Sequence, residues 1–132
     1  MATNESTKVL RVALLIGAIV SFVYGLGFLL VPGALVAMGG GRPVDFGWLR
    51  WPGGWLIALG IGDLLVFLNP AKQGPFVTTI SVGTLLAGLA LLYSWMASEY
   101  SGATWFIGFP TILTLVISAL FWWGRSRAAE IL

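Results

Sequence analysis

The chain has 132 residues, of which 58% are hydrophobic and only 9% charged, and its mean hydropathy is +0.96. This composition is too apolar for a soluble domain of this size, so we expect the chain to fold in lipid. The net charge of +2 comes from basic residues near the ends of apolar segments, which suits lipid headgroups and gives no basic stripe for nucleic acid. The sequence has no Cys and no His, which excludes disulfides, thiol catalysis, the usual zinc sites and histidine ligation of haem or chlorophyll.

Four apolar segments each reach the length of about 20 residues that a membrane-spanning helix needs. Pro32-Gly33 and Asn69-Pro70 end the first two segments, because proline and glycine interrupt helices. The sequence therefore predicts an all-α fold, an integral membrane bundle of four transmembrane helices in a single domain over residues 1–132. The predicted spans are residues 9–31, 48–68, 76–96 and 104–123.

The first span follows a polar, basic start and exceeds the apolar region of about 7–15 residues in a signal peptide, so we interpret it as a retained signal anchor. An even number of spans puts both termini on one side, together with the link between the second and third spans. Because cytoplasmic sides are rich in Lys and Arg, the sequence predicts cytoplasmic termini. The basic residues on that side are Lys8, Arg11, Lys72, Arg125 and Arg127, against Arg42 and Arg50 on the other.

The longest connection, residues 32–46, is half apolar. Residues 33–39 have the composition of a short helix lying along the outer membrane surface, and an ordinary loop is the alternative. The run Gly39-Gly40-Gly41-Arg42 is only a weak phosphate-loop signal, because no strand precedes it and no Lys-Ser or Lys-Thr pair follows. We therefore discount it.

Small residues recur at four-residue intervals in the first two spans. Such stripes let helices approach closely in lipid, where packing drives association. We expect the first two spans to pack on each other along these stripes. The alternative is that one stripe receives a helix of another subunit, and both can hold. The residues are Gly17, Ser21 and Gly25 in the first span and Gly54, Ala58 and Gly62 in the second.

Asp63 is the only acidic residue placed well inside a predicted span. A carboxylate there costs about 2.5–3.5 kcal/mol, so we expect it to face protein or water and to have partners. Ser81, with Thr78 and Thr79 on the third span, and Ser118 on the fourth fall at a similar depth. Together they predict a buried polar layer.

Arg11 is the obvious ionic partner for Asp63, but it lies about 120° around the helix from Gly17, away from the stripe assigned to the second span. Two interpretations of Asp63 remain open. It is either a proton-carrying or cation-binding group, or a hydrogen-bonded or salt-bridged anchor of helix packing.

Aromatic residues gather near the outer ends of the spans. Arg50 adds charge to this rim, with Asp45 and Glu99 nearby, and Pro110 is able to kink the fourth span. These residues predict either a pocket for a quinone, carotenoid or lipid headgroup, or an interfacial belt without a ligand. The rim residues are Tyr24, Arg50, Trp51, Trp55, Tyr93, Trp95 and Trp105.

Two runs resemble small bacterial DoxX-like four-helix membrane proteins: residues 28–32, Phe-Leu-Leu-Val-Pro, and residues 50–60, which begin Arg-Trp-Pro-Gly-Gly. In that family a first helix ends at a Leu-x-Pro turn, and an Arg precedes a Gly-Gly pair that opens the second. The resemblance implies a bacterial inner-membrane protein. Some members are linked to quinone-coupled sulfur oxidation, often as partner subunits, but this sequence has no recognisable catalytic residues for that activity.

Small multidrug transporters carry a glutamate in the first span, whereas Asp63 lies in the second, so we do not expect membership of that group.

Three functions fit these features. The first is a non-catalytic accessory or structural subunit of a larger membrane complex, respiratory or photosynthetic, with lipids and other transmembrane subunits as partners. The second is a small proton-coupled transporter, or a protein that binds a hydrophobic ligand or quinone, using Asp63 and the aromatic rim as a homo-oligomer. The third is a quinone-linked redox component. Known catalytic motifs are absent from the sequence, so it predicts no catalytic residue, metal site or resident cofactor and favours a protein that is not an enzyme.

Overall fold

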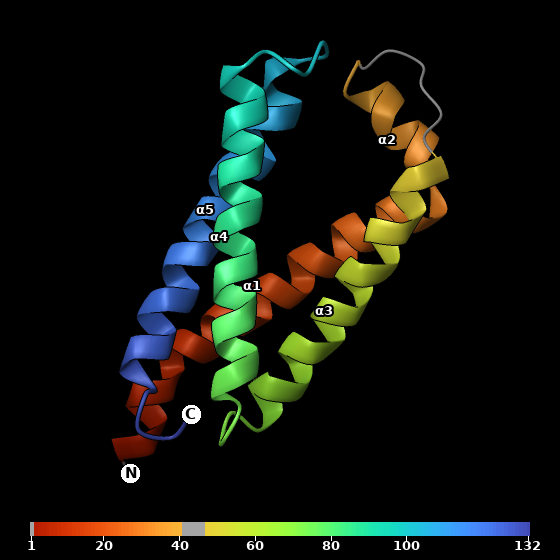
Figure 1. The fold of residues 1–132 in the computed structure, drawn as a ribbon. Coiled ribbons are helices and arrows are strands. Elements are labelled where there is room, and N and C mark those ends of the chain that lie inside the picture. The colour runs from red at the N-terminus through yellow and green to blue at the C-terminus, as the bar shows by residue number, and fades with distance from the viewer. Residues whose placement is uncertain (1, 41–46) are drawn as a thin grey trace.

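The computed structural model describes residues 2–40 and 47–132, and every regular element in these ranges is helical. Four helices are long and apolar enough to cross a membrane, which confirms the predicted all-α fold and makes the chain a multi-pass membrane protein. Figure 1 shows the elements in chain order: α1 (Ala2–Leu30), α2 (Pro32–Met38), the 3₁₀ turn η1 (Gly47–Leu49), α3 (Arg50–Leu68), α4 (Gly74–Met96) and α5 (Thr104–Arg127).

The long helices end near the breaks in the sequence, although three extend beyond the predicted spans, α4 by only two residues at its start. The polar start of the chain is helical from Ala2, and α5 continues through Gly124 to Arg127. A short helix lies where one was expected between the first two spans, beginning at Pro32, whose fixed φ suits the first turn of a helix. Beyond it Gly40 has a φ of +66°, a conformation that glycine adopts without strain.

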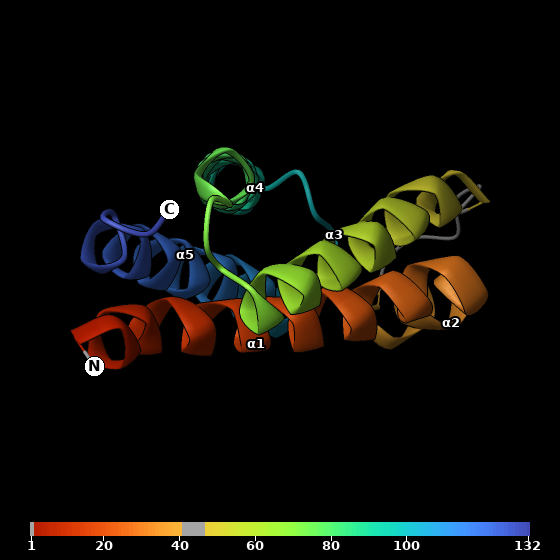
Figure 2. The same ribbon diagram turned by 90° about the horizontal axis from the view of Figure 1, so that it is seen from below.

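Helix α1 is central: α3 packs along one side of it, α5 packs along another, and α4 packs on α5. Figures 1 and 2 show two antiparallel pairs, α1 with α3 and α4 with α5, which lie together near the chain termini and diverge toward the opposite end. We call the end with both termini and the 69–73 link the terminal end. The far end holds α2 and the 97–103 link.

At the far end the two pairs are joined through Gly39. Its carbonyl oxygen accepts a hydrogen bond from the Ala103 N–H at 2.8 Å and another from the Tyr100 hydroxyl at 2.7 Å. The Tyr100 ring stacks on Phe106 with 5.9 Å between ring centroids. The segment after α2 therefore ties the α1–α3 pair to the link between α4 and α5.

The buried core lies toward the terminal end, where α1, α4 and α5 contribute Leu10, Leu14, Val77 and Phe121. Large apolar side chains are exposed along the outward faces of all four long helices. Lipid is as apolar as these side chains, so such faces are expected of helices that contact a membrane.

Candidate buried carboxylate site

Asp63 lies on α3, in the half of the helix nearest the terminal end, and its side chain is fully buried. Neither carboxyl oxygen has a hydrogen-bond partner, and no ion pair reaches Asp63 among the residues that the structure describes. Buried polar groups are nearly always hydrogen-bonded, so an isolated carboxyl needs an explanation. This environment disfavours the charged form of the side chain.

The carboxyl lies where three helices converge. A Cβ built at Gly17 on α1 would be 2.9 Å from Asp63 Oδ2 and 3.0 Å from Phe121 Cζ on α5. Gly17 therefore provides the space that the carboxyl and the ring occupy. One of the stripe residues predicted for helix packing is thus also a wall of the Asp63 site.

Arg11 is close to this region but does not pair with Asp63. Its guanidinium carbon lies 5.7 Å from the centroid of the Phe67 ring, a cation–π distance, and Phe67 is one helical turn along α3 from Asp63. The Arg11 Nε is itself buried without a hydrogen-bond partner. The Arg11 guanidinium therefore lies against α3 one turn from Asp63, and no ion pair joins the two among the described residues.

The serines of the predicted polar layer are buried, but they do not form a network with Asp63. Ser81 donates to the carbonyl of Val77 on its own helix at 2.6 Å. Ser118, one turn from Phe121 on α5, has no hydrogen-bond partner. Thr78 and Thr79 likewise donate to carbonyls of α4, at 2.7 and 2.9 Å. Asp63 and Ser118 are therefore the two members of the layer with unused hydrogen-bonding groups.

Comparisons with protein families, with curated proteins and with solved structures find no match. The chemistry of the site therefore rests on its geometry. The described residues contain no group of three or more His, Cys, Asp or Glu side chains able to hold a metal ion. The unpartnered carboxyl of Asp63 is the titratable group of this site, which suits the binding and release of a proton.

The small-residue stripes are used differently on the two helices. On α1, Gly17 meets Asp63 and Gly25 packs against Gly53, while Ser21 is half-buried. On α3, Gly54 and Ala58 are exposed, and nothing lies within 4 Å of a Cβ built at Gly54.

The α3 face that meets α1 instead contains Gly53 and Gly60, while Gly62 packs against Phe76 of α4. Consecutive residues of a helix point about 100° apart, so a one-residue difference turns the contact face away from the predicted stripe. The repeat of Gly53 and Gly60, two turns apart and in line with Asp63, is the sequence signal that identifies this face.

The aromatic rim does not converge on one pocket. Trp51, Trp55, Tyr93 and Trp105 are each more than half exposed. Three other rim residues make local contacts: Arg50 donates to the Leu29 carbonyl, Tyr24 packs beside Phe28, and Trp95 covers Gly108. Near the rim, Glu99 accepts a hydrogen bond from Ser94 at 2.7 Å, while Asp45 falls outside the described residues.

Proposed function

We propose that this protein is a small proton-coupled membrane transporter in which Asp63 binds and releases the coupling proton. The observation behind the proposal is the fully buried, unpartnered carboxyl at the meeting point of α1, α3 and α5. An unpaired charge in a transmembrane helix costs about 2.5–3.5 kcal/mol. The neutral acid therefore fits this arrangement of the helices, and the carboxylate does not.

Ionisation of Asp63 changes what the surrounding helices must supply. A carboxylate needs water, a cation or a hydrogen-bond donor, and the contact with Gly17 and Phe121 supplies none of these. Arg11, whose Nε is also unpartnered, is the candidate cation for a deprotonated Asp63. The two helix pairs meet in this region and diverge toward the far end (Figure 1), so the proton can bias the angle between them.

Proton uptake into liposomes that contain the purified protein and an internal pH-sensitive dye tests this proposal. We expect uptake driven by an imposed membrane potential, its loss in Asp63→Asn, and its persistence in Ser118→Ala. Infrared difference spectra are expected to contain a protonated carboxylic acid band that disappears in Asp63→Asn. Unchanged uptake in a folded Asp63→Asn protein would refute the proposal.

A second function is a non-catalytic subunit of a larger membrane assembly, such as a respiratory or photosynthetic electron-transfer complex. The observation in its favour is the open face of α3 at Gly54 and Ala58, where small residues leave space for a partner transmembrane helix. A bound quinone or carotenoid would belong to that assembly. The DoxX-like resemblance, with its partner subunits and bacterial inner membrane, belongs to the same proposal.

Gentle detergent extraction followed by native mass spectrometry tests this second function. We expect a partner of fixed stoichiometry that is lost in Ala58→Leu and retained in Gly83→Leu. Gly83 is a matched control because it is also exposed, on α4, with nothing within 4 Å of a built Cβ. Detection of the unmodified chain, Ala58→Leu and Gly83→Leu all without a bound partner would argue against assembly through this face.

We also propose that both termini are cytoplasmic. The chain has no cysteine of its own, so single-cysteine variants can be labelled without background. Ser126→Cys at the terminal end and Ser101→Cys at the far end are both exposed positions. In intact cells a membrane-impermeant maleimide is expected to label Ser101→Cys alone. Labelling of Ser126→Cys alone would reverse the orientation.

A further inference from the structure

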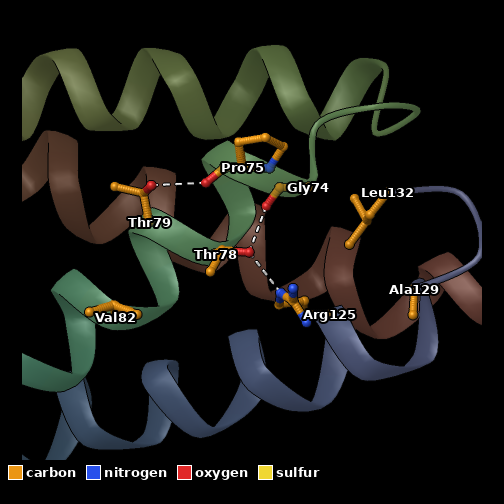
Figure 3. Close-up of a pocket in the computed structure, with 8 residues that line it drawn as sticks. All are labelled: Gly74, Pro75, Thr78, Thr79, Val82, Arg125, Ala129 and Leu132. Atoms are coloured by element: carbon orange, nitrogen blue, oxygen red, sulfur yellow. Dashed lines mark hydrogen bonds between the residues drawn. The ribbon is translucent and has the colours of Figure 1, made fainter.

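A pocket of about 720 Å³ lies at the terminal end, between the start of α4 and the end of α5. Figure 3 shows the side chains that line it, which come from α4, from α5 and from the segment that follows α5. This volume falls in the range of about 300–1,000 Å³ that is usual for small-molecule sites. The pocket is separate from the Asp63 site, since Asp63 does not line it.

Arg125 is held in place at this pocket. Its Nε donates a hydrogen bond to Thr78 Oγ1 at 2.8 Å, and the Thr78 hydroxyl in turn donates to the Gly74 carbonyl at 2.7 Å (Figure 3). No acidic side chain of the described residues pairs with the half-buried guanidinium, so its remaining N–H donors are available. Such a fixed planar cation suits a phosphate oxygen pair.

The charge of the pocket comes from Arg125 and not from the start of α4. The Gly74 N–H, at the beginning of α4, already donates to the Leu132 carbonyl at 3.1 Å. Arg125 is the only charged side chain among the described residues that line the pocket. The exposed Lys72, Arg127 and Glu130 lie at the same end but do not line the pocket.

Apart from Thr79, the rest of the lining is apolar, and it follows α4 from Gly74 to Val82. Val82 lies two turns along α4 from Gly74, about 12 Å at 1.5 Å per residue, and is partly exposed. Pro75 and Leu132 line the polar end beside Arg125. A ligand that fills this shape has an anionic head and an apolar tail, whereas a free phosphate ion would contact only the polar end.

We propose that this pocket binds a phospholipid with an anionic headgroup, its phosphate on Arg125 and an acyl chain along Val82. Basic pockets between transmembrane helices are suited to such headgroups. The site requires no proton transfer at Asp63, so it is independent of the proposed function.

The test is native mass spectrometry of the full chain in detergent, titrated with phosphatidylglycerol or phosphatidylcholine. We expect tighter binding of phosphatidylglycerol to the unmodified chain and a loss of about fivefold in Arg125→Gln, as for one basic contact to an anionic lipid. Thr78→Val keeps the charge but removes the bond that orients it, so a smaller loss is expected. Arg127→Gln, an exposed cation outside the pocket, is the matched control and is expected to bind as the unmodified chain does.

Three outcomes would overturn the proposal. They are equal binding of both lipids, equal losses in Arg125→Gln and Arg127→Gln, and full displacement of the lipid by millimolar inorganic phosphate. The last outcome would identify a site for free phosphate instead. Circular dichroism of each variant shows whether it is folded, and if Arg125→Gln does not fold, Arg125→Lys replaces it, with an expected loss because lysine lacks the planar fork.

Discussion

The contact between α1 and α3 differs in kind from the contact between α4 and α5, although both are antiparallel pairs. A Cβ at Gly53 on α3 would be 2.7 Å from the Leu29 backbone nitrogen and 2.9 Å from the Gly25 carbonyl oxygen. A Cβ at Gly88 on α4 would instead meet the end of the Leu115 side chain at 2.6 Å. In the first pair backbone meets backbone, and in the second a glycine accommodates a flexible side chain.

This difference separates a rigid region from an adaptable one. Helix backbones in contact have no rotamer with which to move apart, whereas a leucine side chain can change its torsion angles. The rigid α1–α3 contact carries Asp63, and the adaptable α4–α5 contact carries the Arg125 pocket. A fixed frame suits a buried carboxyl, and an adjustable one suits a lipid.

The largest effect is expected from Gly53→Ala. The added methyl group overlaps backbone atoms of α1, so the helices must separate, and overpacking of this kind costs about 1–3 kcal/mol. Unfolding of the micelle-bound protein by dodecyl sulfate, followed by circular dichroism, measures the loss. Gly54→Ala is the neighbouring control: its Cβ meets nothing, so no loss is expected, and alanine favours helix over glycine by up to about 1 kcal/mol. Equal losses of unfolding free energy in Gly53→Ala and Gly54→Ala would contradict the assignment of Gly53, and not Gly54, to the face of α3 that contacts α1.

Gly17→Ala is expected to have the next largest effect, about 1 kcal/mol, because its methyl group would press on two side-chain ends instead of backbone. A double-mutant cycle with Asp63→Ala isolates the carboxyl. The methyl group should be better tolerated once the carboxyl is absent, with a coupling free energy of about 0.5 kcal/mol or more. A coupling of zero would show that Asp63 does not occupy the space provided by Gly17.

Sequence reasoning predicted the helices well because hydropathy and helix breakers are local properties. It also predicted that the first two spans pack together, since α1 packs along α3. It could not predict which face of α3 does so, because α3 is apolar around most of its circumference and offers no polar side to set its rotation.

The contacts at the candidate sites depend on positions distant in the sequence. Arg125 donates a hydrogen bond to Thr78, which lies 47 residues away in the sequence. Nothing in either residue type predicts this partner. The place of Arg11 on the helical wheel argued against a pair with Asp63, and no ion pair joins the two among the described residues. That Asp63 would have no partner at all was unexpected, because a buried acid ordinarily has one.

Tyr100→Phe tests the connection at the far end, where the α1–α3 pair and the α4–α5 pair are joined through Gly39. The ring can still stack on Phe106, but the hydrogen bond to the Gly39 carbonyl is lost, which is expected to cost about 0.5–1 kcal/mol.

Burial raises the pKa of the Tyr100 phenol above its ordinary value of 10.0. The stabilisation should therefore be complete below pH 10 and decline as pH rises through the higher folded-state pKa. Unfolding measured on both sides of pH 10 checks this, with Tyr100→Phe expected to lack that decline.

Gly88→Ala is expected to have the smallest effect, below about 0.5 kcal/mol. Leu115 can move its side-chain end away from the new methyl group, and alanine favours helix over glycine by up to about 1 kcal/mol, which offsets the crowding. The same unfolding assay compares it directly with Gly53→Ala. A loss as large as that of Gly53→Ala would mean that α4 and α5 are held as rigidly as α1 and α3. The adaptability assigned to the pair around the Arg125 pocket would then be wrong, whereas the contacts of Asp63 with Gly17 and Phe121 would be unaffected.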